Sequence, residues 1–462
     1  MTGASETPTA RISTSSRPAT QSRKWLRKEE PDEHRPDTAP GTHHRHRMDR
    51  RPPDPRLTRV PHDRRGHHPH RRHHGHRSRA AGASTGAHEA VELRDGETAF
   101  GGKGVDRAVH IARTEVADVL GQHEWTSLAA VDGALRELDG GEQLARIGAN
   151  TAVATSIAAA RAFAFVAHEH LYSWLSKETE SVELLPVPHF NVLNGGAHAT
   201  NGLAFQEFMI APVGASSEAE AVTTGAEVYH ALRSAIAHRY GSTGLGDEGG
   251  FAPPIADPKE ALELLVSAIG DAGFVAAVDG VAIALDPAAN GFHHDGSYRV
   301  GDRTLTSDQL ADYYLELVDE FPVRSLEDGF AEEDLDGWTV FAQRAANSVQ
   351  IVGDDLYVTD PTRIRDGADR GYSNAVLIKP NQIGTVTDTL AAIATARSVG
   401  MACMISHRSG ETLDTFIADL AVGTGVGQIK SGAPARGERI AKYNRLTDIE
   451  TANPALRYGL RP

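Results

Sequence analysis

The sequence has almost no cysteine, no long apolar run and no leader-like N-terminus. A single cysteine among 462 residues excludes a disulfide scaffold and a cysteine-based metal cluster, and it fits a reducing compartment. No run of 18 apolar residues occurs, so we expect no membrane span. The first residues lack an apolar segment with basic flanks and a small-residue cleavage site, so we expect no secretory signal. These absences predict a cytoplasmic protein.

Charge is distributed unevenly along the chain. Residues 1–80 carry 19 Lys and Arg against 9 Asp and Glu, whereas residues 81–462 carry 28 against 53. The acidic second part argues against specific nucleic-acid binding and suits sites for divalent cations. The 40% of hydrophobic residues and the 45 glycines predict a loop-rich α/β enzyme.

The basic first part also holds 11 of the 23 histidines and 10 of the 23 prolines. Between Gly41 and Arg79 the large apolar residues are Met48, Leu57 and Val60, too few to form a core. We therefore predict that residues 1–80 are disordered. Their composition is what GC-rich DNA yields in a wrong reading frame.

From about Leu185 onward, short apolar runs alternate with helical patterns. Helices are predicted at 103–120, at 151–171 with Thr151 as its cap, at 307–320, and at 385–399 with Thr385 as its cap. Six apolar runs are predicted as buried strands: 281–286, 323–328, 349–355, 374–379, 401–407 and 427–430. This alternation predicts a parallel sheet, either open or closed into a barrel.

A polar side chain stands at or next to the end of each of these runs. The six residues are Asp286, Glu327, Asp354, Lys379, His407 and Lys430. In a barrel the carboxyl ends of the strands meet at one face, where the active site lies. Six such residues in succession therefore predict one site.

The types of these residues indicate a particular chemistry. Three carboxylates, from Asp286, Glu327 and Asp354, favour a hard cation, Mg²⁺ first and Mn²⁺ second. A lysine close to metal ions and to another lysine is driven toward its neutral form, so Lys379 is a candidate base, and Lys430 can hold an anionic substrate. Together they suit removal of a proton next to a carboxylate, because the metal stabilises the resulting enediolate.

Other loops supply candidate acids and anion-binding groups. Glu248 lies in the glycine-rich loop GDEGGF, and Glu207 in FQEFM stands between apolar residues, where desolvation favours its protonated form. Each could equally be an ordinary turn or strand residue. Arg408 and Ser409 follow His407 and suit a phosphate. His198 lies in a Gly/Asn-rich loop, where a histidine is more often structural than functional.

Between Gly82 and about Glu450, close to 80% of the chain, the sequence contains the motifs GASTGAHEA, FNVLNGGAHA, FQEFMIAP, GDEGGFAP, LEDGFAEEDLDGW, IVGDDLYVT, LIKPNQIGT, SHRSGETLDTFIADLAVG and GQIKSGAPARGERIAKYN. These motifs carry a resemblance to the enolase family. It implies an α/β fold: a TIM-like (β/α)8 barrel whose early strands depart from the all-parallel order, beside a small N-terminal α+β capping domain. We place this domain, incomplete here, at 81–178 and the barrel at 179–462.

The resemblance also implies an activity, the Mg²⁺-dependent dehydration of 2-phosphoglycerate to phosphoenolpyruvate in glycolysis. Two Mg²⁺ ions per active site are implied, the first held by Asp286, Glu327 and Asp354 and the second by Ser84. Lys379 would remove the C2 proton, and Glu248 with Glu207 would assist loss of the C3 hydroxide. The residues implied to contact this small phosphorylated substrate are His198, Gln206, Glu207, His407, Arg408, Ser409 and Lys430. A homodimer or higher homo-oligomer is implied, and the family allows an additional cell-surface or secreted pool.

Departures from the family pattern leave two alternatives open. Residues 1–80 lack the family's first strands, Gly291 stands where a glutamate is usual, and Pro380 follows Lys379 in place of an aliphatic residue. One alternative is a related enzyme that removes a proton from a different carboxylate; GDEGG with SHRSGET favours a phosphorylated substrate instead. The other is an enolase-like barrel that binds without catalysing.

Overall fold

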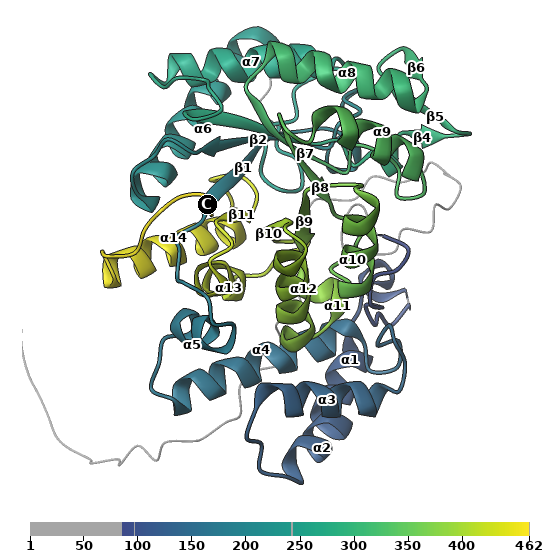
Figure 1. Ribbon diagram of the computed structural model, residues 1–462, viewed down its shortest axis with the longest axis vertical. Helices are drawn as coiled ribbons and strands as arrows, with labels where there is room; N and C mark the ends of the chain where they lie inside the picture. Colours follow the sequence, from purple (N-terminus) through teal and green to yellow (C-terminus); the bar gives the residue numbers. More distant parts are fainter. Residues whose placement is uncertain (1–85, 97, 242–243, 462) are drawn as a thin grey trace, which may run out of the picture. The chain divides into compact units, whose positions relative to one another are not determined.

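Eight strands close into a barrel in the computed structural model of the chain, which describes residues 86–96, 98–241 and 244–461. The order around the barrel is β1-β11-β10-β9-β8-β7-β3-β2. Figure 1 shows β7, β8, β9, β10 and β11 near the centre of the molecule. The strands are β1 (Val187–Asn194), β2 (Glu207–Pro212), β3 (Val281–Asp286), β7 (Val323–Glu327), β8 (Gln350–Gly353), β9 (Ala375–Ile378), β10 (Ala402–Ser406) and β11 (Gln428–Lys430). The expected barrel is confirmed, whereas the expectations for residues 1–80 and for Ser84 lie outside the described residues.

All six apolar runs form barrel strands, most of them one or two residues shorter than predicted. Strands β3, β7, β8, β9, β10 and β11 pair in parallel with their neighbours in this group. Parallel strands covered by helices are buried on both faces, which is why they read as continuous apolar runs.

Strand β2 runs against the others. It pairs antiparallel with both β1 and β3, and Glu207 at its start lies opposite Asp286 at the end of β3. The reversal places the first residue of β2, rather than its last, at the carboxyl face of the barrel.

A second, three-stranded antiparallel sheet was not predicted. It consists of β4 (His293–His294), β5 (Ser297–Val300) and β6 (Arg303–Leu305). Asp295 and Gly296 join β4 to β5 with φ values of 50° and 73°, the backbone that an Asp-Gly hairpin turn requires. This dipeptide was a readable hairpin signal.

Helices follow most strands of the barrel. They are α6 (Glu218–Tyr240), α7 (Pro258–Asp271), α8 (Ser307–Glu320), α9 (Leu335–Ala345), α10 (Pro361–Arg370), α11 (Pro380–Ile383), α12 (Val386–Ser398), α13 (Phe416–Thr424) and α14 (Gly437–Ala452). Short 3-10 turns occur at η3 (Gly196–His198) and η4 (Ala289–Gly291). Thr385 caps α12 as predicted, and Thr306 with Gln309 forms a capping box at the start of α8.

The described part of the chain before β1 is helical. Its elements are η1 (Ala99–Gly102), α1 (Asp106–Ile111), η2 (Ala112–Val116), α2 (Ala117–Gly121), α3 (Leu128–Asp139), α4 (Ala149–Val166) and α5 (Leu171–Glu178). The prediction that Thr151 caps a helix was wrong, because α4 begins at Ala149. The amide of Ala149 donates to the carbonyl of Val91, and Asn150 binds the backbone of Leu93, so contacts with a distant segment extend the helix.

Helix α4 is long and apolar enough to cross a membrane by length and composition, with a mean hydropathy of 1.3 over 18 residues, 39% of them buried. In the structure it packs against α1, α3, α5, α11 and α12. These are the contacts of an alanine-rich helix within a folded unit. It ends earlier than predicted, since His168 adopts a φ of 57° before α5 begins.

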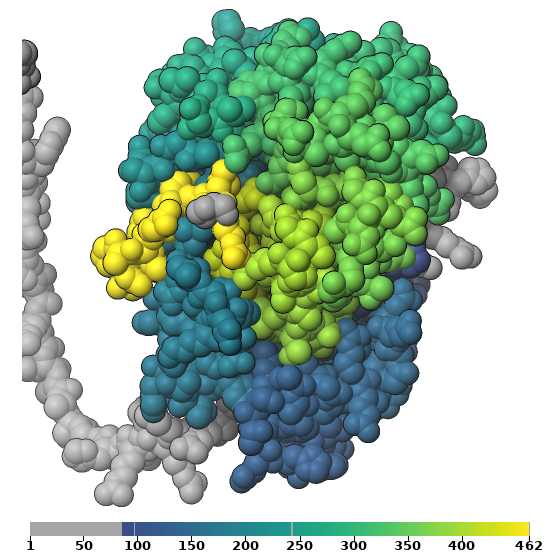
Figure 2. Space-filling view, in the orientation of Figure 1, coloured from purple at the N-terminus to yellow at the C-terminus, as the bar shows by residue number. Residues whose placement is uncertain are grey.

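The N-terminal helices pack on the barrel through polar contacts as well as apolar ones. Ser156 accepts the amide of Val386, Asp132 accepts the amide of Thr387, and Arg161 forms two hydrogen bonds with Asp414. Figure 2 shows these helices, in blue, directly against the yellow-green segment that includes α12. The described residues belong to one contact unit, residues 54–462.

Candidate active site

The predicted site residues that the structure describes lie at the carboxyl face of the barrel. Asp286, Glu327 and Lys430 are the last residues of β3, β7 and β11. Three more residues directly follow β8, β9 and β10: Asp354, Lys379 and His407. All six are less than a tenth exposed. Closure of the sheet therefore brings these six residues close together, although they are spread over 145 positions of the sequence.

Lys430 lies among three carboxylates. Its Nζ atom is 2.8 Å from Oδ2 of Asp286, 2.8 Å from Oε1 of Glu327 and 3.2 Å from Oε1 of Glu207. Burial by itself lowers the pKa of Lys430, but these acidic neighbours raise it well above its usual value. Lys430 is therefore a fixed positive charge at neutral pH.

Lys379 forms a close ion pair with Oδ2 of Asp354. Burial lowers the pKa of Lys379, yet the carboxylates of Asp354 and Glu327 outweigh burial, Arg408 and Lys430, so its pKa is raised. This is opposite to the neutral lysine predicted for a site that holds metal ions, because here the lysine itself compensates Asp354. The other oxygen of Asp354 accepts a hydrogen bond of 2.9 Å from Nε2 of Gln382.

The donor set fits a hard cation. Asp286, Glu327 and Asp354 offer only carboxylate oxygens, and Oε2 of Glu327 is buried without a hydrogen-bond partner among the described residues. Burial and the charge of Asp286 raise the pKa of Glu327 well above its usual value. A divalent cation would give Oε2 of Glu327 a partner and would stabilise the ionised form of this carboxyl. These residues are therefore compatible with Mg²⁺.

The three predicted ligands are not the tightest cluster. Within the described residues, groups of three ligand atoms within 4.8 Å of one another come from two other sets: His198, Glu207 and Glu248, and Asp328, Asp354 and Asp355. In the second set, Asp328 accepts the backbone amides of Asp354 and Asp355 at 2.8 and 2.9 Å. Asp328 therefore orients the turn that carries Asp354.

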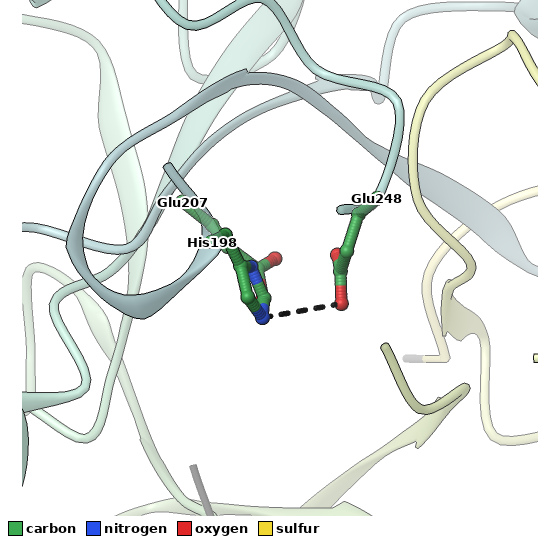
Figure 3. Close-up of side chains that lie close together, drawn as sticks. All are labelled: His198, Glu207 and Glu248. Carbon is green, nitrogen blue, oxygen red and sulfur yellow. Dashed lines mark ion pairs between the residues drawn. The ribbon is translucent and has the colours of Figure 1, made fainter. Parts of the chain in front are cut away.

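Glu207, Glu248 and His198 form a second buried group (Figure 3). The Nδ1 and Nε2 atoms of His198 lie 3.8 Å from Glu207 and 3.9 Å from Glu248. Burial and the charge of Glu248 raise the pKa of Glu207 well above its usual value. Burial raises the pKa of Glu248 as well, but His407, His198 and Arg439 outweigh burial. The pKa of Glu248 is therefore lowered well below its usual range. The pKa values of these two neighbouring carboxyl groups are therefore shifted in opposite directions.

Glycines allow the Glu248 loop to approach β1. A Cβ atom on Gly246 or Gly250 would come within 2.7 or 2.5 Å of the Asn194 side chain. The close approach lets Asn191 donate a hydrogen bond of 2.9 Å from Nδ2 to Oε2 of Glu248. Glycine at these positions therefore serves the placement of the carboxylate.

His407 is held in one tautomer. Nη1 of Arg439 lies 2.5 Å from Nδ1 of His407, and because arginine only donates, the ring proton must be on Nε2. That nitrogen lies 3.1 Å from Oε2 of Glu248. Burial, with the nearby charge of Arg439, lowers the pKa of His407 to about 4, so the ring is neutral at pH 7.

The remaining predicted residues lie around this centre. Arg408 is buried and pairs with Glu89, and the Ser409 carbonyl accepts a hydrogen bond from Arg439 at 2.6 Å. Gln206 is buried directly before β2, and its backbone N–H donates a hydrogen bond to the backbone carbonyl of Asp286.

Sequence reasoning missed three residues that contact the predicted site: Glu89, Gln382 and Arg439. Each lies inside a motif quoted for the family resemblance, in GASTGAHEA, LIKPNQIGT and GAPARGERIAKYN. Their positions within these motifs were the available signal.

The two departures near the site are accommodated. A Cβ atom at Gly291 would meet nothing within 4 Å, so the turn there does not require glycine for space. Pro380 occupies the first position of α11, where its missing N–H and its fixed φ suit a helix start.

Comparison with known proteins agrees with this geometry. Residues 182–455 match the family model described as the enolase C-terminal TIM barrel domain, and residues 69–175 match the enolase N-terminal domain. The second match begins before Gly82. A protein named "Enolase" from Acidothermus cellulolyticus is 50% identical over 380 residues, which cover 82% of this chain and 88% of that protein. The chain therefore belongs to the enolase family and is an enzyme, a phosphopyruvate hydratase.

Proposed function

We propose that this lyase catalyses the Mg²⁺-dependent, reversible dehydration of 2-phospho-D-glycerate to phosphoenolpyruvate, a step of glycolysis and gluconeogenesis. One observation carries the proposal: two buried lysines share a single barrel face with the carboxylates of Asp286, Glu327, Asp354 and Glu207. These residues would supply a base, a positive charge that holds an anionic substrate, and a cation site close to one another. This is the set that proton removal next to a carboxylate requires.

Lys379 is the proposed base for the C2 proton of the substrate. It is buried, and among the described residues its one close carboxylate partner is Asp354. A base must be free of its proton, so Asp354 has to exchange this ion pair for another cation before the lysine can act. Mg²⁺ held by Asp286, Glu327 and Asp354 would supply that charge and would stabilise the negative charge that develops on the substrate carboxylate.

Glu207 and Glu248 are the proposed groups at the C3 hydroxyl. Glu207 is the proposed proton donor, because burial and the charge of Glu248 raise its pKa well above the usual value. Transfer of that proton to the departing hydroxide releases water, and Lys379 keeps the proton taken from C2, so the protons balance. Glu248, placed by Asn191 and facing His407, would orient the hydroxyl.

Substrate contacts are proposed for residues around this centre. Arg408 and Ser409 suit the phosphate, and Lys430 suits the carboxylate. Neutral His407 can donate a hydrogen bond from Nε2. The buried residues His198 and Gln206 are the remaining proposed substrate contacts.

Several properties of the protein follow from the family and remain proposals. These are the second Mg²⁺ with Ser84, a homodimer or higher homo-oligomer, the boundary between residues 178 and 179, and a cytoplasmic location. An additional cell-surface or secreted pool stays a prediction of the resemblance.

The test is turnover of 2-phosphoglycerate by the full chain, followed through the ultraviolet absorbance of phosphoenolpyruvate. We expect activity with Mg²⁺, reduced or equal activity with Mn²⁺, and none after chelation. Glycerate without the phosphate should not be converted. Turnover that persists in excess chelator would contradict the metal requirement, and absence of turnover with Mg²⁺ would overturn the proposed function.

A further inference from the structure

Glu89 connects the N-terminal part of the chain to the barrel site. It lies in the segment that follows Gly86, and this segment is fixed to α11 because the amide of Ala90 donates to the carbonyl of Gln382 at 2.7 Å. The carboxylate of Glu89 accepts hydrogen bonds of 2.8 and 3.2 Å from Nη1 and Nη2 of Arg408. The Glu89 and Arg408 side chains are each 8% exposed. The pair is therefore a buried, two-pronged ion pair.

Gln382 extends this contact to the proposed base. The amide of Lys379 donates to Oγ1 of Thr359, so the Thr359 hydroxyl donates onward to Oε1 of Gln382 at 2.7 Å. The nitrogen of the Gln382 side chain must then face Oδ1 of Asp354, at 2.9 Å, and Oε1 of Glu89, at 3.4 Å. A continuous path thus runs from Glu89 through Gln382 and Asp354 to Lys379.

We propose that Glu89 is a positioning residue, which holds the guanidinium of Arg408 in the orientation that receives the substrate phosphate and, through Gln382, aligns Asp354 with Lys379. This inference rests on the proposed function.

The competing charges explain why Arg408 needs such a partner. Asp354 and Asp355 also attract the Arg408 guanidinium electrostatically, and both belong to the turn that carries a proposed metal ligand. Without Glu89 the guanidinium would move toward these carboxylates and away from a phosphate. With Glu89, two N–H groups are fixed and the remaining donors keep a defined direction.

The experiment is steady-state kinetics of Glu89→Gln, Glu89→Asp and Gln382→Leu with 2-phosphoglycerate. For Glu89→Gln we expect KM to rise roughly tenfold or more, because the two-pronged ionic contact is lost, with a smaller change in kcat. Glu89→Asp keeps the charge and should recover part of the affinity. Gln382→Leu leaves the Glu89–Arg408 pair intact and should lower kcat more than it raises KM.

A matched control is Asp414→Asn. Asp414 also forms two hydrogen bonds with an arginine, Arg161, across the contact between the N-terminal helices and the barrel. It should lower the melting temperature without changing KM. A KM for Glu89→Gln within twofold of the parent value, in a folded protein, would overturn the inference.

A second measurement separates this inference from the proposed function. Calorimetric binding of inorganic phosphate needs no turnover, and we expect it to be weaker in Glu89→Gln than in the parent chain. If the parent chain does not convert 2-phosphoglycerate, the proposed function fails, and equal phosphate affinity in the two proteins would then overturn the role of Glu89 as well.

Discussion

The Nζ atom of Lys430 lies 2.8 Å from Oδ2 of Asp286, across the barrel from β11 to β3. Because the same ammonium group also contacts Glu327, it compensates two carboxylates that would otherwise be buried and mutually repelling, and it lies 3.2 Å from Glu207 as well. Lys430 is therefore structural as well as a proposed anchor for the substrate.

This arrangement predicts that Lys430→Met destabilises the protein in a metal-dependent way. Loss of one partner of a buried ion pair costs about 3–5 kcal/mol, and Mg²⁺ at the carboxylates should restore part of it. Melting temperatures in chelator and in excess Mg²⁺ measure the difference. The exposed pair of Lys259 with Glu320 provides a control, since Lys259→Met should change the melting temperature little in either buffer. If Lys430→Met lowered the melting temperature equally with and without Mg²⁺, the result would contradict the prediction.

Lys379→Ala should abolish turnover in a protein that still folds, with a lower melting temperature because Asp354 loses its buried partner. Removal of a general base typically lowers the rate about 10²–10⁴-fold. Exchange of the substrate C2 proton with solvent, followed by NMR, isolates the step assigned to this lysine. Exchange at the parent rate would exclude Lys379 as the base, even if overall turnover had fallen.

Asp354→Asn should weaken Mg²⁺ binding, because one anionic oxygen ligand becomes a neutral amide. Titration calorimetry with Mg²⁺ alone measures this without substrate. Asp312→Asn, at an exposed pair with Arg344, is the matched control and should bind Mg²⁺ as the parent does. Equal Mg²⁺ affinity in Asp354→Asn and the parent would show that Asp354 is not a ligand.

Glu218 should make stability depend on pH. It is fully buried, and neither carboxylate oxygen has a hydrogen-bond partner among the described residues. Burial, with the nearby Glu450, raises the pKa of Glu218 well above 4.5. The folded state therefore binds this proton more tightly than the unfolded state. The stabilising effect is complete below pH 4.5 and is lost as pH rises toward the folded-state pKa, by about 1.4 kcal/mol per pH unit.

Two substitutions test this dependence. Glu218→Gln should remove this slope, and Glu218→Leu should also raise the free energy of unfolding at pH 7, by about 1–3 kcal/mol, because an unsatisfied polar group is replaced by an apolar one. Denaturant unfolding at several pH values measures both effects. Glu227→Gln, at an exposed position of α6, should keep the slope of the parent. A slope that survives Glu218→Gln would assign it to another group.

The sequence by itself determined six of the eight barrel strands and several of their boundaries, but not β1 and β2. Continuous apolar runs and the polar residues that end them are local features, so Asp286, Glu327 and Lys430 could be assigned to strand ends without coordinates. The cap at Thr385 was equally local, since a hydroxyl before a helical pattern satisfies the first free amides.

Tertiary structure decided what depends on residues far apart in the chain. Glu207 reaches the site because β2 runs antiparallel, which no pattern within FQEFM reveals. Helix α4 begins at Ala149 because a segment more than 50 residues earlier supplies its backbone partners. The charge of Lys379 and the link from Glu89 to Arg408 likewise follow from distances and burial. Electrostatic energy depends on separation in space and on desolvation, and a linear sequence specifies neither.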